Sequence, residues 1–317
     1  MTSRYLIAGG TGFVGKALTN HLKTLNREAT ILSRTNPSFS PNRITWDELH
    51  TKQNDFDYLI NLCGSNFVGN SIIPPNFTGN FFNDAAKEEA RNSRVGTAKK
   101  LKTYVDDSIS IKRFVQITGV GAYPYQEHGD VEVFDEDSEI ANKNGHFFQE
   151  LVYDIESAAE TEKTSNIRSG VVFGNGGALE KQLPIYKLGF GVKMGGSGFL
   201  GAGAGTQFLP WIHIEDMARL IVHTAESEKL HKTVNGVSPD LVTQSDFDRE
   251  LKRALGKNEN FPPGLLGVLP GAQVRLMFGE DRANLICKGM KIQPKVAVES
   301  GFVYKYEKIA DALKSLV

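Results

Sequence analysis

The first half of the chain alternates short apolar runs with segments whose apolar residues recur every three or four positions. The run at 4–8 predicts a strand. After it, Val14, Leu18, Leu22 and Leu25 lie at spacings that place them on one face of a helix. Later segments predict strands at 30–32, 43–46, 58–62, 114–117 and 167–173, and helices at 84–105 and 146–162. This alternation predicts an α/β fold with a parallel sheet and helices on both faces.

The pattern changes after residue 173. Residues 189–205 hold eight glycines, which predicts a loop without regular structure. A substrate lid and a linker without function are both open for this loop. Residues 210–214 return as a short strand, and 215–225 read as a helix with acids in its first turn. The remaining predicted elements are two helices, near 270–288 and from residue 307.

A glycine turn separates the first predicted strand from the first predicted helix. Glycines recur at every third position, which lets the backbone turn tightly and approach a pyrophosphate. The N-terminus of the helix then presents its free N–H groups to that anion. A plain glycine-rich turn is the alternative, but strand, turn and helix together predict a dinucleotide site. The residues of this predicted cradle are Gly9, Gly10, Thr11, Gly12, Phe13, Val14 and Gly15.

The end of the second strand indicates which dinucleotide binds. An NAD site usually has an acid there, which binds the ribose 2′-OH. This chain has Ser33 and Arg34 at that place and no acidic residue between Ala29 and Trp46. A guanidinium pairs with a 2′-phosphate, and the serine hydroxyl adds a hydrogen bond. We therefore predict NADP(H) as cofactor, with a surface role for Arg34 as the alternative.

These patterns predict a Rossmann-type doubly wound parallel sheet with a small C-terminal lobe on the substrate side. We expect residues 1–175 to form the NADP-binding domain, completed by about 208–240. The smaller lobe would comprise 176–207 and 241–317. A chain of 317 residues is long enough to bury a core of this kind.

Composition and charge indicate which partners and which cellular compartment to expect. The formal net charge of −1 gives no indication of a nucleic acid or an anionic membrane as partner, and no apolar run is long enough to cross a bilayer. Cys63 and Cys287 have no metal-ligand spacing, so we expect no metal. The passage from Met1 directly into a strand predicts no cleavable signal and an intracellular, most simply cytoplasmic, protein. The nucleus, an organelle and any oligomeric state remain open.

The chain resembles the short-chain dehydrogenase/reductase superfamily, and within it the atypical, epimerase-like family 39U. The resemblance rests on blocks that occur in the family's order along almost the whole chain. Those blocks are 43–46 (RITW), 61–64 (NLCG), 93–94 (SR), 118–123 (TGVGAY), 168–172 (RSGVV), 176–179 (GGAL), 210–214 (PWIHI), 278–280 (FGE), Pro294 and 300–302 (SGF).

The resemblance implies further cofactor contacts beyond the glycine turn. Leu62, Cys63 and Gly64 would lie on the adenosine side, at the end of the fourth strand. Two charged residues of the long helix, Glu89 and Arg94, would approach the cofactor, and Val172 would line the nicotinamide pocket. From the residues alone, the two charges are equally well explained as solvated side chains, and Cys63 as a small core residue.

The catalytic residues of the superfamily are only partly present. Typical members use a Ser or Thr hydroxyl with a Tyr and a Lys four positions apart. Thr118 follows the predicted fifth strand and supplies the hydroxyl, with turn capping as its alternative role. Phe148 and Val152 occupy the places of Tyr and Lys, as the resemblance also implies. Tyr123 is our predicted proton donor, because its loop also carries Thr118; packing beside the nicotinamide or the substrate is the alternative.

Two functions follow from these residues. The first is an NADP(H)-binding, epimerase-like oxidoreductase that acts on an unidentified small carbonyl or hydroxyl substrate. The second is an NADP(H)-binding sensor or partner-binding protein with little or no turnover. The glycine turn supports binding in both cases, while Phe148 and Val152 favour the second.

Overall fold

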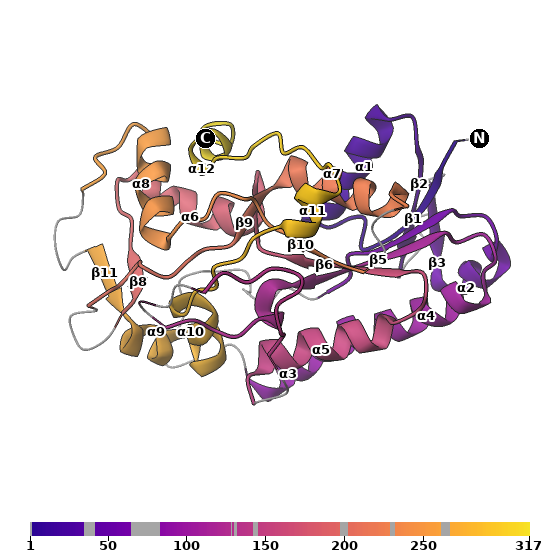
Figure 1. The fold of residues 1–317 in the computed structure, drawn as a ribbon, viewed down its shortest axis with the longest axis horizontal. Coiled ribbons are helices and arrows are strands. Elements are labelled where there is room, and N and C mark those ends of the chain that lie inside the picture. Colours follow the sequence, from indigo (N-terminus) through magenta and orange to yellow (C-terminus); the bar gives the residue numbers. More distant parts are fainter. Residues whose placement is uncertain are drawn as a thin grey trace.

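The computed structural model describes residues 2–34, 42–64, 83–127, 129, 132–141, 145–196, 202–228, 232–260 and 267–317. A seven-stranded parallel sheet forms the centre of the molecule (Figure 1). Its strands are β1 (Arg4–Ala8), β2 (Glu28–Ser33), β3 (Arg43–Thr45), β4 (Tyr58–Asn61), β5 (Arg113–Gly119), β6 (Thr164–Ser169) and β10 (Thr233–Gly236). They lie in the order β10-β6-β5-β4-β1-β2-β3. From β1 the chain adds β2 and β3 on one side, and from β4 it adds β5 and β6 on the other, so the strand order reverses between β1 and β4. Ligands of such sheets bind at that reversal, beyond the carboxyl ends of the strands, and the predicted doubly wound fold is confirmed.

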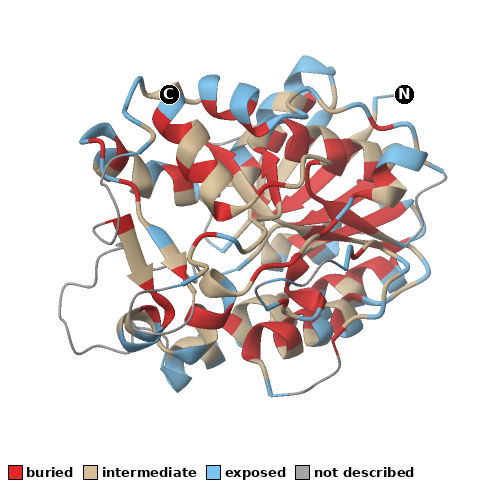
Figure 2. Cartoon of the chain, turned by 60° about the vertical axis from the view of Figure 1, so that its left-hand side comes forward, coloured by how far each residue is buried: buried red, intermediate tan, exposed pale blue. Residues whose placement is uncertain are grey.

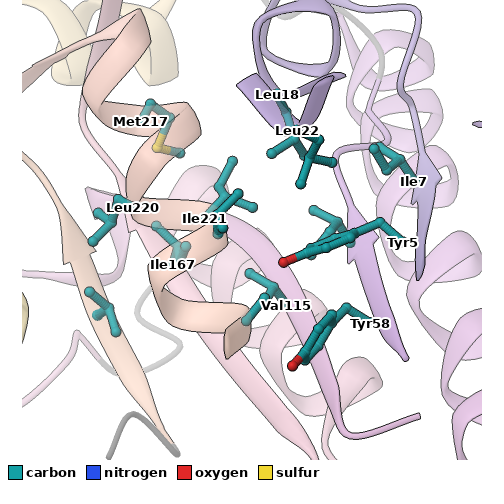
Figure 3. Close-up of a cluster of buried hydrophobic side chains, with 14 of the residues drawn as sticks. Tyr5, Ile7, Leu18, Leu22, Tyr58, Val115, Ile167, Met217, Leu220 and Ile221 are labelled. Carbon is teal, nitrogen blue, oxygen red and sulfur yellow. The ribbon is translucent and has the colours of Figure 1, made fainter. Parts of the chain in front are cut away.

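Helices cover both faces of the sheet because successive strand residues point to opposite sides. Tyr5 and Ile7 pack on one side with residues of the two helices shown in Figure 3. Leu6 and Ala8 pack on the other side. The helices that contribute to the first side are α1 (Phe13–Thr24), α7 (Ile214–Glu226) and α11 (Lys295–Glu299). Those that contribute to the second are α2 (Trp46–Leu49), α4 (Thr97–Asp107) and α5 (Phe147–Ala159). The central strands β1 and β4 are accordingly buried, while the outer faces of the helices are exposed (Figure 2).

The long helix predicted over 84–105 is present but is not uniformly α-helical. It begins as α3 (Asp84–Arg91), passes through a π-helical turn at Asn92–Gly96 and continues as α4 to Asp107. The π turn contains Arg94, one of the predicted cofactor residues. Single π turns inside helices are frequent at functional sites, because they shift the direction of the side chains that they carry.

The prediction of a single strand over 167–173 is wrong, because this segment is divided between two strands. The chain forms β6, breaks at Gly170 and continues as β7 (Val171–Gly174), which pairs with β9 (Trp211–His213) in a separate two-stranded sheet. A Cβ atom at Gly170 would lie 2.6 Å from the carbonyl oxygen of Pro210. The close approach of this distant segment therefore requires glycine and marks the point where the chain leaves the main sheet.

The strand predicted over 43–46 ends one residue early. Thr45 accepts a hydrogen bond from the backbone N–H of Glu48, and the Glu48 carboxylate accepts one from the backbone N–H of Thr45. This capping box starts α2 at Trp46, so Trp46 is helical.

Most of the remaining elements gather at one end of the sheet, on the left of Figure 1, whereas α7, α11 and β10 belong to the sheet or cover its face. The glycine-rich segment 189–205 was expected to lack regular structure, but it contains β8 (Lys193–Gly195), which pairs with β11 (Val268–Pro270). Residues 197–201 of that segment lie outside the described part. The helices of this end are α6 (Gly177–Lys187), α8 (Gln244–Ala254), α9 (Gly271–Phe278), α10 (Glu280–Cys287) and α12 (Ile309–Lys314).

The helix predicted near 270–288 is two helices. Gly279 separates α9 from α10 with a φ of +79°, a conformation that L side chains rarely adopt. The helix predicted from residue 307 begins at Ile309 as α12. Among the helices within the described ranges, none is long and apolar enough to cross a membrane.

Candidate functional site

The glycine turn between β1 and α1 has the geometry of a phosphate cradle. Gly9 has a φ of +80°, and a Cβ atom there would lie 2.8 Å from the carbonyl carbon of Leu62. A Cβ atom at Gly15 would lie 2.6 Å from the Cα of Gly10. The N–H of Gly12 donates to the Gly9 carbonyl over 3.0 Å, and no described side chain caps the start of α1. The first amides of α1 thus remain available to an anion, as a pyrophosphate site requires.

Phe13 lies between the glycine turn and the segment that follows β7. Cβ atoms at Gly174, Gly176 and Gly177 would lie 2.8, 2.8 and 3.1 Å from atoms of the Phe13 ring. Three glycines therefore allow the chain after β7 to pack directly on this ring. Val172, predicted to line the nicotinamide pocket, is half-buried on β7 two residues before Gly174. The glycine turn, predicted to bind the pyrophosphate, and Val172, predicted to line the nicotinamide pocket, therefore lie on neighbouring segments.

The ends of β2 and β4 bring together three of the predicted cofactor residues. Arg34 is exposed directly after β2, and Ser33 is half-buried beside Thr45 of β3. Burial raises the pKa of the Cys63 thiol to about 11, although the charges of Arg34 and Arg94 oppose this rise. Both guanidinium groups are therefore close enough to Cys63 to act on its ionisation, so positive charge is concentrated around Cys63.

Arg94 extends from the π turn over the chain that follows β4. A Cβ atom at Gly64 would lie 2.5 Å from the Arg94 Cζ atom, so only glycine permits this arrangement. Arg94 Nη1 donates to the Ala90 carbonyl over 3.3 Å, and burial lowers the pKa of Arg94 to about 10. A partly buried cation of this kind favours an anionic ligand. Glu89 is exposed on α3, and its contact with the cofactor stays a prediction.

Thr118 lies inside β5, opposite Arg168 of β6, so the expectation that it follows the strand is wrong. The strand continues to Gly119 because it pairs with the whole length of β6. Thr118 Oγ1 donates to Glu156 Oε1 over 3.1 Å. Arg168 Nε and Nη2 donate to the two oxygens of the same carboxylate over 2.9 and 2.8 Å. The hydroxyl is thus held by a buried ion pair.

Tyr123 is fully buried, and its hydroxyl is already engaged by neighbouring side chains. It donates to Asn235 Oδ1 over 2.8 Å and accepts from Arg168 Nη1 over 3.3 Å. Its ring stacks on Phe134, and burial raises the pKa of the phenol although Arg168 opposes the rise. Proton donation by Tyr123 stays a prediction. It would require the hydroxyl to exchange these partners for a substrate.

The ion pair of Glu156 and Arg168 that holds Thr118 was not predicted from the sequence. Phe148 and Val152 are buried on α5, and Glu156 lies four residues further on the same helix face. An acid that continues a buried helix face was the available signal. Arg168 gave a similar signal, since it is a charged residue in an apolar strand.

Two cavities accompany these residues. One, of about 290 Å³, adjoins Gly10 and Thr11 of the glycine turn. The other, of about 590 Å³, is lined by Gln126 of the chain beyond β5, by Arg275 of α9 and by Gly203 of the glycine-rich segment. The glycine-rich segment therefore borders a cavity between the loop after β5 and the C-terminal elements.

Comparison with known proteins agrees with this geometry. Residues 5–235 match the NAD dependent epimerase/dehydratase family, and residues 269–316 match a domain of unknown function (DUF1731). The chain is 36% identical over 321 residues to the human epimerase family protein SDR39U1, with 99% of each chain covered. A crystal structure of human SDR39U1 (isoform 2) with NADPH matches with a TM-score of 0.83 at 33% identity, covering 99% of this chain and 98% of that one.

A more distant structure shows the same fold. It is the nucleoside-diphosphate sugar epimerase from Corynebacterium glutamicum, with a TM-score of 0.71 at 24% identity. This chain covers 57% of that longer protein. Fold and glycine turn together define a dinucleotide-binding α/β protein of the epimerase type. The chain belongs to the NAD dependent epimerase/dehydratase family, and the resemblance to family 39U is confirmed by its similarity to SDR39U1.

Proposed function

We propose that the chain binds NADP(H) and uses it to oxidise or reduce a small hydroxyl or carbonyl substrate. The observation that carries the proposal is the end of β2, where Ser33 ends the strand next to β1, Arg34 follows it, and the sequence has no acidic residue between Ala29 and Trp46. An acid there would repel a 2′-phosphate, whereas a guanidinium binds it. The NADPH in the similar human structure supports the same choice.

The described residues would fit such a cofactor in four places. The glycine turn and the N-terminus of α1 would hold the pyrophosphate, since glycine at positions 9 and 15 lets the turn pack tightly on the backbone of Leu62 and of Gly10 and leaves the first amides of α1 available. Ser33 and Arg34 would hold the 2′-phosphate, and Arg94 would face the adenosine side with its partly buried positive charge. Val172 would line the nicotinamide pocket. The predicted residues Leu62, Cys63, Gly64 and Glu89 complete the proposed site.

The bound cofactor would supply or accept the hydride. Thr118 would position the substrate, because its proton is committed to Glu156 and its lone pairs can accept a hydrogen bond. In this arrangement Thr118 is suited to a substrate hydroxyl rather than to a carbonyl. Arg168 keeps Glu156 in place and so fixes the direction of the threonine hydroxyl.

The cofactor proposal is tested by the dissociation constants for NADPH and NADH. We expect Arg34→Ala to weaken NADPH binding by about 10-fold or more, because a charged hydrogen bond contributes about 1.5–3 kcal/mol. NADH binding should change by less than about two-fold, since NADH lacks the 2′-phosphate. Lys99→Ala, an exposed lysine on α4, is the control. Equal wild-type affinities for the two cofactors would contradict the proposal.

A sensor with little turnover is the second candidate function. Two observations favour it: Phe148 and Val152 are buried apolar residues on α5, and the Tyr123 hydroxyl is engaged. A screen of NADPH oxidation against a library of carbonyl compounds distinguishes the two functions. Turnover of one compound supports the oxidoreductase. Tight NADPH binding without turnover of any compound supports the sensor.

A further inference from the structure

The smaller cavity carries positive charge directly beside the glycine turn. It measures about 290 Å³ and lies between α1, β2 and the edge strand β3. Gly10 and Thr11 of the turn form part of its wall, together with Lys16 of α1 and Arg43 of β3. Of its described lining residues, Lys16 and Arg43 are the charged ones, and both are cationic. A concave surface of one sign attracts an ion of the other sign, so the cavity favours an anion.

The register of the strands places Arg43 on the cofactor side of the sheet edge. Ile31 is opposite Arg43 and Ser33 is opposite Thr45, so Arg43 lies one strand away from the end of β2. Paired residues of parallel strands point to the same face. Ile31 lies against the turn on that face, because its Cγ1 atom would be 2.9 Å from a Cβ atom at Gly10. Arg43 therefore projects toward the glycine turn.

One nitrogen atom of the Arg43 guanidinium lacks a hydrogen-bond acceptor among the described residues. This atom, Nε, is buried. Buried polar groups in folded proteins are nearly always paired, and the exceptions often mark an ion or ligand. An anion in the cavity would supply the missing acceptor to Nε.

Lys16 is placed where a cation is normally unfavourable. It lies in the first turn of α1, near the positive end of the helix dipole. The first turn of α1, all of which the structure describes, contains no acidic residue that would compensate. An anion bound between Lys16 and Arg43 would interact favourably with both side chains and with the dipole.

We propose that Arg43 and Lys16 bind a phosphomonoester dianion in this cavity. The inference rests on the proposed function, under which that group is the 2′-phosphate of NADP(H). Arg43 offers a planar fork for two phosphate oxygens, and Lys16 offers a mobile point charge. Arg34, at the end of β2, would contact the same phosphate from its other side. Preference for NADP(H) over NAD(H) would then depend on three cations from three elements.

The test compares two nucleotides that differ only in the 2′-phosphate, 2′,5′-ADP and 5′-AMP, by isothermal titration calorimetry. We expect Arg43→Gln to weaken 2′,5′-ADP binding by about 10- to 100-fold and Lys16→Ala by about 3- to 10-fold. Binding of 5′-AMP should change by less than about two-fold in both variants. Arg43→Lys should recover part of the loss. Lys23→Ala is the matched control, since Lys23 is exposed on α1 and does not line the cavity.

The outcomes separate this inference from the proposed function. If the wild type prefers 2′,5′-ADP and both Arg43→Gln and Lys16→Ala keep that preference in full, the inference is overturned and the NADP(H) proposal stands. If the wild type does not prefer 2′,5′-ADP, both fail. A third arm measures inorganic phosphate. Weaker phosphate binding in Arg43→Gln, with unchanged 2′,5′-ADP binding, would overturn the inference in favour of a free-phosphate site. Lys16 is exposed, so its variant remains informative if Arg43→Gln does not fold.

Discussion

Thr118 Oγ1 donates a hydrogen bond to Glu156 Oε1 over 3.1 Å and thereby links the carboxyl end of β5 to α5. Glu156 also accepts two hydrogen bonds from Arg168 of β6, and both charged side chains are almost entirely buried. This is the region where other members of the superfamily resembled here would place a Tyr and a Lys. The chain instead has the ion pair of Glu156 and Arg168 in this region. We expect this pair to stabilise the fold and to orient the Thr118 hydroxyl.

Removal of one partner of this pair should destabilise the fold. In Glu156→Gln the Arg168 guanidinium remains buried without its counter-charge, so we expect a loss of about 3 kcal/mol in the free energy of unfolding in urea. Asp106→Asn is the control, because its pair with Lys102 is exposed on α4 and should contribute less than about 0.5 kcal/mol. Equal effects of the two substitutions would contradict the structural role of Glu156.

Glycine at position 15 should be required both for folding and for cofactor binding. In Gly15→Ala the new Cβ atom would lie 2.6 Å from backbone atoms of Gly10, and the turn must shift. We expect a loss of about 1–3 kcal/mol in unfolding free energy and NADPH binding at least about 10-fold weaker. Gly96→Ala is the matched control, since its Cβ atom would meet no atom within 4 Å. It should keep NADPH affinity, and a comparable loss there would contradict the prediction.

Substitution of Tyr123 separates packing from proton donation. Tyr123→Phe removes the hydroxyl that donates to Asn235 and leaves that buried acceptor unpaired. We expect unfolding free energy to fall by about 1–2 kcal/mol, with NADPH affinity changed by less than about two-fold. Once a substrate is identified, unchanged turnover of this variant would end the proton-donor prediction. A loss of turnover without a loss of stability would support it.

Both cysteines should be slow to alkylate in the folded protein. Burial raises the pKa of Cys63 and of Cys287 to about 11, from an ordinary value of 9.0. Since the thiolate is the reactive form, the reactive fraction at pH 8 should be about 100-fold smaller than in the unfolded chain. Rates of reaction with iodoacetamide, measured by mass spectrometry in buffer and in urea, test this prediction. Equal rates in the two conditions would contradict it.

Local signals in the sequence were sufficient for the central strands β1 and β4 and for the glycine turn, but not for β10 or for the end of β6. β1, β4 and the start of α1 follow directly from apolar runs and periodicity, because burial on both faces of a parallel strand requires them. The turn from Gly9 to Gly15 is equally local, since the positive φ of Gly9 and the close contact between Gly15 and Gly10 arise within a few residues of β1. These features depend on neighbours in the chain and were therefore predictable.

Only the tertiary structure decided which distant groups meet. Gly170 ends β6 because the segment at Pro210 passes within contact distance, and nothing near Gly170 in the sequence announces that approach. The Tyr123 hydroxyl is engaged by Asn235, a residue 112 positions away. Arg43 becomes a candidate ligand only because the β2–β3 register brings it beside the glycine turn. Sequence patterns report the burial of single segments, whereas partners across the core are set by packing and register.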